Sequence, residues 1–354
     1  MSVAQRGARL SPPLRSRRRL APRRSAVVLV VAGLLTVLGL PAGPVAADPG
    51  AAGPLSGPDA AAALEAFLDE VMADHLDRFD LAGASVTVVK DGASLVSKGF
   101  GHADVAAGEP VEATTTLFPT ASVAKLFTWT AVMQLVEQGR IDLDAEVNSY
   151  LASLEAPDNF DEPVRVWHLL SHSAGFEDKP MSLAVRPDDL TGLEAALPRE
   201  MPSQDCEPGR YTAYSNFSTG LAGHVVAEVS GMSWEDYVDR HILEPLGMTR
   251  TSTSQPTPEG MQAGMAKVYR SHAGELVEAD HEIVSMAPYG GMVASTDDMG
   301  RFMLAHLQTG GAGEARILQD ETAQQMHSQL FSHDPRLAGN AHGYWESTEH
   351  GQRA

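Results

Sequence analysis

Sheet-forming segments stand on both sides of a helix-rich middle in this 354-residue chain, and this order limits the folds that it can adopt. The valine-rich residues 84–90 predict a strand, and Asp91-Gly92 predicts a tight turn into a second strand over 94–100. A second hairpin is predicted around Ala273-Gly274. We therefore expect an α/β (α+β) fold, an antiparallel sheet flanked by helices, into which an all-helical lobe is inserted.

Glycine and proline divide the middle of the chain into short helices. One helix is predicted to begin at Thr120 or Ala121 and to stop at Gly139. Other helices are expected over residues 60–79, 219–230, 234–246 and 295–307, the last of them capped by Ser295-Thr-Asp-Asp298. A short helix is expected near Leu193 inside the loop 178–207. Residues 343–346 and 352–354 are predicted to be strand fragments around a turn.

The N-terminal residues differ in composition from the rest of the chain. Residues 1–47 contain eight arginines and no acidic residue, and residues 26–40 form a mostly apolar run. Because this run is short for a membrane span and is followed by Val45-Ala46-Ala47, it predicts a signal peptide cleaved near Ala47. The protein would then be extracellular or in the cell envelope. An uncleaved anchor remains the alternative, and Arg23-Arg24 leaves the export route, Sec or twin-arginine, open.

The predicted mature chain is strongly acidic. Removal of residues 1–47 leaves 18 basic side chains against 46 acidic ones, a net charge of −28. Such a surface repels phosphate backbones and anionic lipids, which argues against nucleic-acid partners and against a membrane partner after cleavage. Cys206 is the only cysteine, so the chain has no internal disulfide. The sequence carries no signal for the oligomeric state.

Ser122 and Lys125 form the first candidate catalytic pair. They lie three residues apart at the predicted start of a helix, so both side chains share one helix face. A hydroxyl with an amine within reach is the minimum machinery for nucleophilic acyl transfer. A second element follows at Tyr214-Ser215-Asn216, which places a phenol and an amide two residues apart.

These two motifs, in this order, resemble those of the serine β-lactamase-related family. That family includes class C β-lactamases, D-alanyl-D-alanine carboxypeptidases and related esterases, which are penicillin-recognising serine hydrolases. Further matching stretches in the same order are His168-Leu-Leu-Ser-His-Ser-Ala-Gly-Phe176, Pro208-Gly209, Glu244-Pro-Leu-Gly-Met-Thr-Arg250 and Gly290-Gly-Met-Val-Ala-Ser-Thr296. The resemblance covers roughly residues 60–354.

The resemblance implies a role for each of four residues. Ser122 would be the nucleophile, and Lys125 would take its proton, which requires a pKa below the free value of about 10.4. Tyr214 would relay the proton to the leaving group, and its proximity to a cation would favour the phenolate. Asn216 would bind the substrate's side chain. The backbone N–H of Ser122 would supply half of an oxyanion hole.

The family's third motif, Lys- or His-x-Gly on a strand that lines the site, is not found in its expected place. No Lys-Thr-Gly occurs, and His272-Ala-Gly274 fits only as a string, because it falls in a predicted hairpin turn. The segment from Tyr344 resembles the approach to the missing strand. We therefore expect a chain truncated before this motif, without its last sheet strands, C-terminal helix and second oxyanion donor.

Composition, the order of the predicted elements and the resemblance together predict the domain organisation. Residues 1–47 would be the signal peptide and 48–58 a linker, followed by a β-lactamase-related domain over 59–354. Within it, residues 59–119 and 264–354 would form the α/β lobe and residues 120–263 the helical lobe.

Two other site chemistries fit the sequence less well. His168 and His172 stand at i, i+4, a spacing that suits zinc on a helix, but no third ligand is evident nearby. A Ser-His-Asp triad lacks the Gly-x-Ser-x-Gly elbow. We therefore expect no metal and no cofactor.

The sequence thus predicts an exported serine hydrolase that forms an acyl-enzyme on Ser122. Its substrate would be a small molecule or a peptide of peptidoglycan type, in the form of an ester, a D-amino-acid peptide or a β-lactam. The alternatives are a non-catalytic substrate-binding relative and an inactive fragment that lacks half of the oxyanion hole.

Overall fold

In the structure, a computed structural model, the predicted hairpin forms the first two strands of the main sheet. It describes residues 59–178, 184–349 and 352–353. Strands β1 (Gly83–Lys90), β2 (Ala93–Asp104) and β3 (Glu109–Pro110) lie side by side in that order, all antiparallel. Asp91 and Gly92 both have positive φ in the turn between β1 and β2, as this dipeptide predicts.

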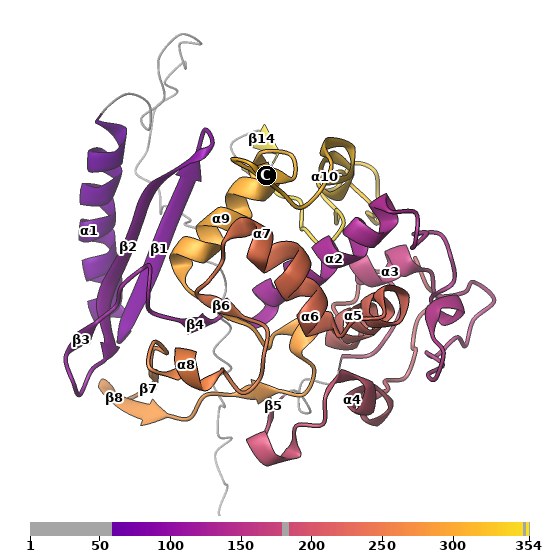
Figure 1. Ribbon diagram of the computed structural model, residues 1–354, viewed down its shortest axis with the longest axis horizontal. Helices are drawn as coiled ribbons and strands as arrows, with labels where there is room; N and C mark the ends of the chain where they lie inside the picture. The colour runs from indigo at the N-terminus through magenta and orange to yellow at the C-terminus, as the bar shows by residue number, and fades with distance from the viewer. Residues whose placement is uncertain (1–58, 179–183, 350–351, 354) are drawn as a thin grey trace, which may run out of the picture. The chain divides into compact units, whose positions relative to one another are not determined.

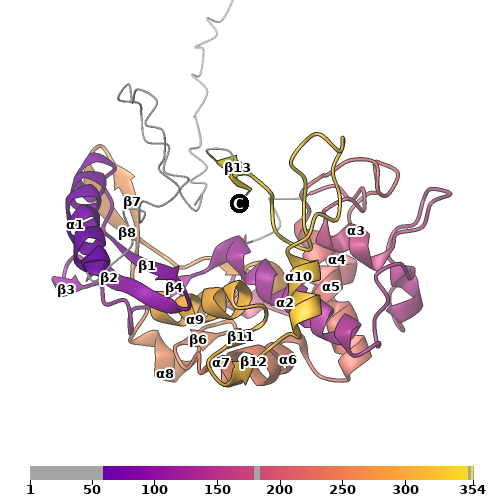
Figure 2. The same ribbon diagram turned by 90° about the horizontal axis from the view of Figure 1, so that it is seen from above.

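Two helices cover opposite faces of this sheet (Figures 1 and 2). Successive side chains of a strand point to opposite faces. Val88 of β1 packs on the apolar cluster that α1 (Ala60–Arg78) forms with β2, whereas its neighbour Thr87 faces Gly300 of α9 (Thr296–Leu307). The sheet therefore lies between a helix from the start of the described chain and one from its last third.

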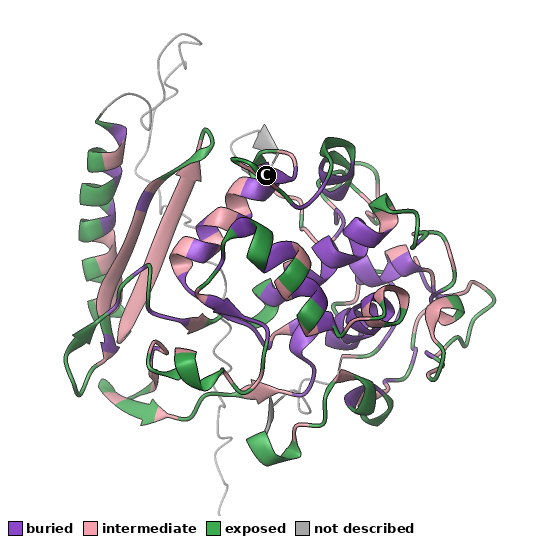
Figure 3. Ribbon diagram, viewed as in Figure 1, coloured by how far each residue is buried: buried purple, intermediate pink, exposed green. Residues whose placement is uncertain are grey.

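The core of the helical part is built on α2 (Lys125–Glu137) and α5 (Asn216–Ser230). Both helices are buried over most of their length (Figure 3), as expected for helices that are apolar on all sides. Phe127 of α2 stacks on Phe302 of α9 with ring centroids 4.1 Å apart, which joins this core to the sheet side. The surrounding helices are α3 (Val166–Leu170), α4 (Leu193–Glu200), α6 (Trp234–Val238), α7 (Glu244–Leu246), α8 (Glu259–Gln262) and α10 (Asp320–Met326).

A second small sheet leads the chain toward the helical core. Its strands β4 (Phe118–Pro119), β10 (Val293–Ala294) and β6 (Thr251–Ser252) lie in that order and pair antiparallel. The remaining strands form two-stranded pairs: β5 (Ala184–Val185) with β9 (Ile283–Val284), β7 (Val268–His272) with β8 (Glu275–Ala279), β11 (Gly311–Ala312) with β12 (Ala315–Arg316), and β13 (Thr348–Glu349) with β14 (Gln352–Arg353). The mixed α/β class predicted from the sequence is confirmed.

The prediction of one continuous α-helix over residues 234–246 is wrong, because a π-helical turn at Asp239–Leu243 separates α6 from α7. Pro245 has no N–H to donate to the carbonyl of His241, and its ring would clash with that carbonyl in a regular helix. The carbonyl of His241 instead accepts a hydrogen bond from Nε2 of Gln134, at 3.0 Å. The strand fragment predicted over 343–346 is also absent as a strand, and only an isolated bridge from Trp345 to Asn340 is formed there.

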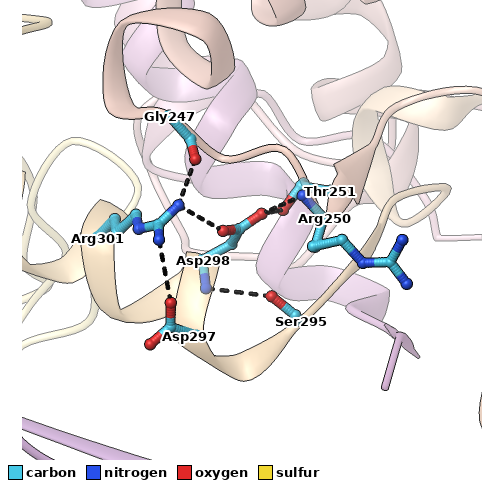
Figure 4. Close-up of polar contacts among 7 residues, drawn as sticks. All are labelled: Gly247, Arg250, Thr251, Ser295, Asp297, Asp298 and Arg301. Atoms are coloured by element: carbon cyan, nitrogen blue, oxygen red, sulfur yellow. Dashed lines mark hydrogen bonds and ion pairs between the residues drawn. The ribbon is translucent and has the colours of Figure 1, made fainter. Parts of the chain in front are cut away.

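Asp298 ties the start of α9 to the segment between α7 and β6 (Figure 4). Its carboxylate, which is 2% exposed, accepts hydrogen bonds from the backbone N–H of Arg250 at 2.7 Å and the hydroxyl of Thr251 at 3.0 Å. The guanidinium of Arg301 pairs with it at 3.1 Å. Ser295 caps α9, as predicted, by accepting from the backbone N–H of Asp298.

The signal peptide predicted for residues 1–47 and the linker predicted for 48–58 lie outside the described residues. The division of residues 59–354 into two lobes stays a prediction. In the part of the chain that is described, no helix is long and apolar enough to span a membrane.

Candidate active site

Ser122 is presented to solvent on a short 3₁₀ turn, Ala121–Ala124, that precedes α2. The predicted helix therefore begins with a tighter turn than expected. Ala121 has a φ of 46°, an uncommon conformation for a residue with a Cβ, and such strain often accompanies a functional site. Thr120 fixes the entry to the turn, because both its N–H and its hydroxyl donate to the carbonyl of Met292. The hydroxyl of Ser122 is thus held at the surface above a buried helix.

Lys125 is buried directly beneath Ser122, with 4% of its surface exposed. Its Nζ lies 3.1 Å from Oγ of Ser122, 2.8 Å from Oδ1 of Asn216 and 2.8 Å from the backbone carbonyl oxygen of Tyr289. The structure therefore brings together the pair that the helical spacing predicted, and it adds the Tyr289 carbonyl, which sequence reasoning did not find.

The three partners of Lys125 differ in what they can do. The amide oxygen of Asn216 and the carbonyl oxygen of Tyr289 can only accept hydrogen bonds, whereas the hydroxyl of Ser122 can also donate. A neutral amine has two N–H groups and one lone pair. If its N–H groups serve the two acceptors, its lone pair faces Ser122, which is the geometry that a general base needs.

Burial favours the neutral form of the Lys125 amine near neutral pH. It lowers the pKa of Lys125 from 10.5 to about 7, and the negative charge of Asp178 opposes that shift. The sequence-based expectation of a lowered lysine pKa is met by burial. No neighbouring cation contributes to it among the residues that the structure describes.

Tyr214 approaches Ser122 from the other side of the site. Its hydroxyl lies 2.8 Å from Oγ of Ser122, and Nζ of Lys125 lies 4.9 Å from the centre of its ring. Burial raises the pKa of Tyr214 above 10, although the hydrogen bond to Ser122 lowers it. The expectation that the nearby cation would favour the phenolate is therefore wrong: Tyr214 is a neutral phenol with a proton to give.

His172 lies behind Tyr214, and sequence reasoning assigned it no part in this site. The two rings are 4.6 Å apart, and Nδ1 of His172 accepts from the backbone N–H of Ser215 at 3.3 Å. Burial and, to a smaller extent, the charge of Lys125 lower the pKa of His172 to about 3, so the imidazole is neutral. It supports Tyr214 from below without a charge.

The spacing argument for zinc at His168 and His172 fails in the structure. α3 ends at Leu170, and His172 has a φ of 53°, so the two histidines do not share a helix face. Nδ1 of His168 accepts from the backbone N–H of Arg165 at 2.8 Å. Within the described ranges, no group of three or more His, Cys, Asp or Glu side chains is placed to hold a metal ion.

Asn216, the first residue of α5, uses both ends of its side-chain amide within the protein. Its oxygen accepts from Lys125, and its nitrogen donates to Oδ1 of Asp178 at 3.1 Å. The backbone N–H of Asn216 also donates to Oδ1 of Asp178 at 3.1 Å. Asp178 is the third residue of this site, after Tyr289 and His172, that the sequence did not reveal.

The string His272-Ala-Gly274 lies in a hairpin turn, as the sequence predicts. His272 is exposed at the end of β7, and Ala273 and Gly274, with φ of 55° and 86°, form the turn into β8. This hairpin bonds to Asp80 through Ser271. It is a surface turn and does not have the strand geometry of the third motif.

Comparisons with known proteins show which family the sequence matches. The sequence model of the family described as Beta-lactamase matches residues 68–352. Penicillin-binding protein 4 of Amycolatopsis lactamdurans is 30% identical over 72% of this chain and 69% of its own length. Protein flp of Staphylococcus aureus strain N315 is 24% identical over 80% of this chain, which spans only 56% of that relative.

A solved structure also resembles this one. The octameric penicillin-binding protein homologue from Pyrococcus abyssi superposes with a TM-score of 0.67 at 26% identity, covering 82% of this chain and 66% of its own. The fold therefore has the β-lactamase and transpeptidase arrangement that the motifs predicted.

Proposed function

Because the chain belongs to the Beta-lactamase family, a family of serine hydrolases, we propose that it forms an acyl-enzyme on Ser122. One observation carries the proposal: Oγ of the exposed Ser122 lies within hydrogen-bond distance of both the amine of Lys125 and the phenol of Tyr214. A nucleophile, a base of suitable pKa and a proton donor thus meet at one atom.

Each step of acylation has a group in this site. Neutral Lys125 takes the proton of Ser122 as Oγ forms a bond to the substrate's carbonyl carbon, and the carbonyl electron pair moves onto oxygen. The backbone N–H of Ser122 stabilises this oxyanion. When the tetrahedral intermediate collapses, the phenol of Tyr214 gives its proton to the leaving group and regains one from Lys125. In deacylation these proton transfers run in reverse. Tyr214 gives its proton to Lys125 and takes one from water, which attacks the carbonyl carbon of the acyl-enzyme. Lys125 then returns a proton to Oγ of Ser122 as the acyl–Oγ bond breaks and the acid is released.

The substrate is proposed to be an ester, a D-amino-acid peptide or a β-lactam. Relatives described as penicillin-binding proteins support a small molecule or a peptide of peptidoglycan type. Asn216 would contact the substrate's acyl side chain through its amide nitrogen, which has two N–H groups and can keep its bond to Asp178 while it donates to the substrate. An exported location, outside the cell or in its envelope, is part of the same proposal.

Covalent labelling tests the acyl-enzyme directly. The protein is expected to be labelled by a fluorescent penicillin or a fluorophosphonate. Ser122→Ala is expected to abolish the label, because it removes the hydroxyl that is hydrogen-bonded to Lys125. Ser149→Ala is the control, since the hydroxyl of Ser149 is exposed and bonded to the carbonyl of Glu146. Gel fluorescence of folded protein provides the measurement.

The labelling result separates the alternatives. A folded protein that binds penicillin reversibly and is never labelled would be a substrate-binding relative without turnover. Label that persists in Ser122→Ala would show that another residue is the nucleophile.

The pH dependence tests the role of Lys125. Only the neutral amine can accept the proton, and the pKa of Lys125 is about 7, so the reactive form increases as pH rises through 7. We expect kcat/KM for a chromogenic ester to fall about tenfold per pH unit on the acid side and to level off above neutrality. A rate that stays constant between pH 5 and 8, by an assay corrected for spontaneous hydrolysis, would contradict a lysine base.

A further inference from the structure

Asp178 lies beside the catalytic cluster on a segment with a fixed backbone. Phe176 is buried, forms a bridge with Gln204, and packs edge-on against Phe217 of α5 at 5.4 Å. The N–H of Glu177 donates to the carbonyl of Ser203 at 3.0 Å. These contacts bring the half-buried carboxylate of Asp178 to the first turn of α5.

The carboxylate of Asp178 determines which way the amide of Asn216 points. Its Oδ1 accepts from both the backbone N–H and the side-chain nitrogen of Asn216, each at 3.1 Å. A carboxylate can only accept hydrogen bonds, so it selects the NH₂ end of the amide and leaves the oxygen to face Lys125 at 2.8 Å. If the amide were reversed, its NH₂ could bond only to the lone pair of the Lys125 amine, which the base needs for the proton of Ser122.

Asp178 also completes the charge balance around Lys125. The groups that face Lys125 are the phenols of Tyr214 and Tyr289, the imidazole of His172 and the amide of Asn216. With both phenols and the imidazole neutral at pH 7, Asp178 is the anion that acts on Lys125 among the described residues. It offsets part of the effect of burial on the amine.

We propose that Asp178 is a positioning residue of the acyl-transfer site, which orients the Asn216 amide toward Lys125 and supplies the counter-charge of that lysine. This inference rests on the proposed function. It adds a residue that keeps the amine of Lys125 hydrogen-bonded to Asn216 and that places a negative charge near this amine. The macrodipole of α5 favours the carboxylate at this position, because Asp178 lies against the N-terminus of a 15-residue helix.

The test compares pH profiles of kcat/KM for a p-nitrophenyl ester. In Asp178→Asn the counter-charge is lost while an accepting oxygen remains. The acid limb of the profile, where kcat/KM falls as pH decreases, is therefore expected to move to lower pH by about one pH unit. The plateau of kcat/KM above this limb should stay within about threefold of the wild type. In Asp178→Ala the limb moves likewise, and the plateau falls about tenfold because the Asn216 amide is free to rotate. The limb position distinguishes electrostatic tuning from a structural defect.

Glu177→Gln is the matched control. It removes the adjacent carboxylate, which bonds to the hydroxyl of Ser203, and should leave the limb and the plateau unchanged. An acid limb that stays in place in both Asp178 variants, with normal thermal midpoints, would overturn the inference and leave the acyl-enzyme intact. A wild-type protein that neither turns over the ester nor is labelled at Ser122 would overturn the proposed function itself.

Discussion

Replacement of Lys125 by alanine is expected to slow acylation of Ser122 by about 10³-fold, because general-base catalysis by a positioned group is worth about 10²–10⁴-fold. The amine lies 3.1 Å from Oγ of Ser122 and is the buried base with a pKa near neutrality in this site. The measurement is the rate of labelling by a fluorophosphonate under pseudo-first-order conditions. The acid limb near pH 7 should disappear from the residual activity.

Lys267→Ala is the control for loss of a lysine. Lys267 is partly exposed and pairs with Asp104 and Glu278 outside the catalytic cluster. Its replacement should change the labelling rate less than about twofold, in line with the small effects of surface ion pairs. A Lys125→Ala variant that retains a tenth or more of the wild-type rate would show that another group takes the proton of Ser122.

The residues of the site that could be predicted are those whose relation is local in sequence. Ser122 and Lys125 are three residues apart, and a helical turn brings such residues together without help from the rest of the fold. Tyr214 and Asn216 were found through the resemblance that their motif carries. Their distances from Ser122 and Lys125 could not be derived from sequence, because contacts across about 90 residues depend on how α2 and α5 pack.

Asp178 and the carbonyl of Tyr289 escaped prediction for the same reason. Asp178 acts on Asn216 across 38 residues from a loop, and Lys125 reaches Tyr289 across 164. A backbone carbonyl leaves no trace in side-chain composition, and a single aspartate in an acidic loop is not distinguished from its neighbours. The sequence signal for Asp178, if any, is its place just after the matched segment that ends at Phe176.

The fold was predictable where periodicity or turn chemistry is strong. The β1–β2 hairpin has the Asp91-Gly92 turn, and α9 has the Ser295 cap, and both were found. By contrast, β4, β6 and β10 are two residues long, which is too short for polarity to alternate visibly. These strands pair only because tertiary packing brings three distant segments together.

Asp298→Ala is expected to lower the free energy of unfolding by about 3 kcal/mol, because it leaves several buried partners without an acceptor. The backbone N–H of Arg250 and the hydroxyl of Thr251 both lose their bond to this carboxylate. Arg301 loses one of its two acidic partners. The thermal midpoint, followed by circular dichroism, should fall by about 6 °C.

Asp297→Ala separates this buried role from the general effect of a negative charge at the start of a helix. Asp297 stands one residue earlier in the same first turn of α9 and also pairs with Arg301, but its side chain is 32% exposed. Its loss should cost less than about 1 kcal/mol, since water replaces the missing contact. Equal falls in the two variants would attribute the effect to the helix dipole. A much larger fall in Asp298→Ala would show that the buried carboxylate stabilises the fold through its bonds to Arg250 and Thr251, the latter in β6.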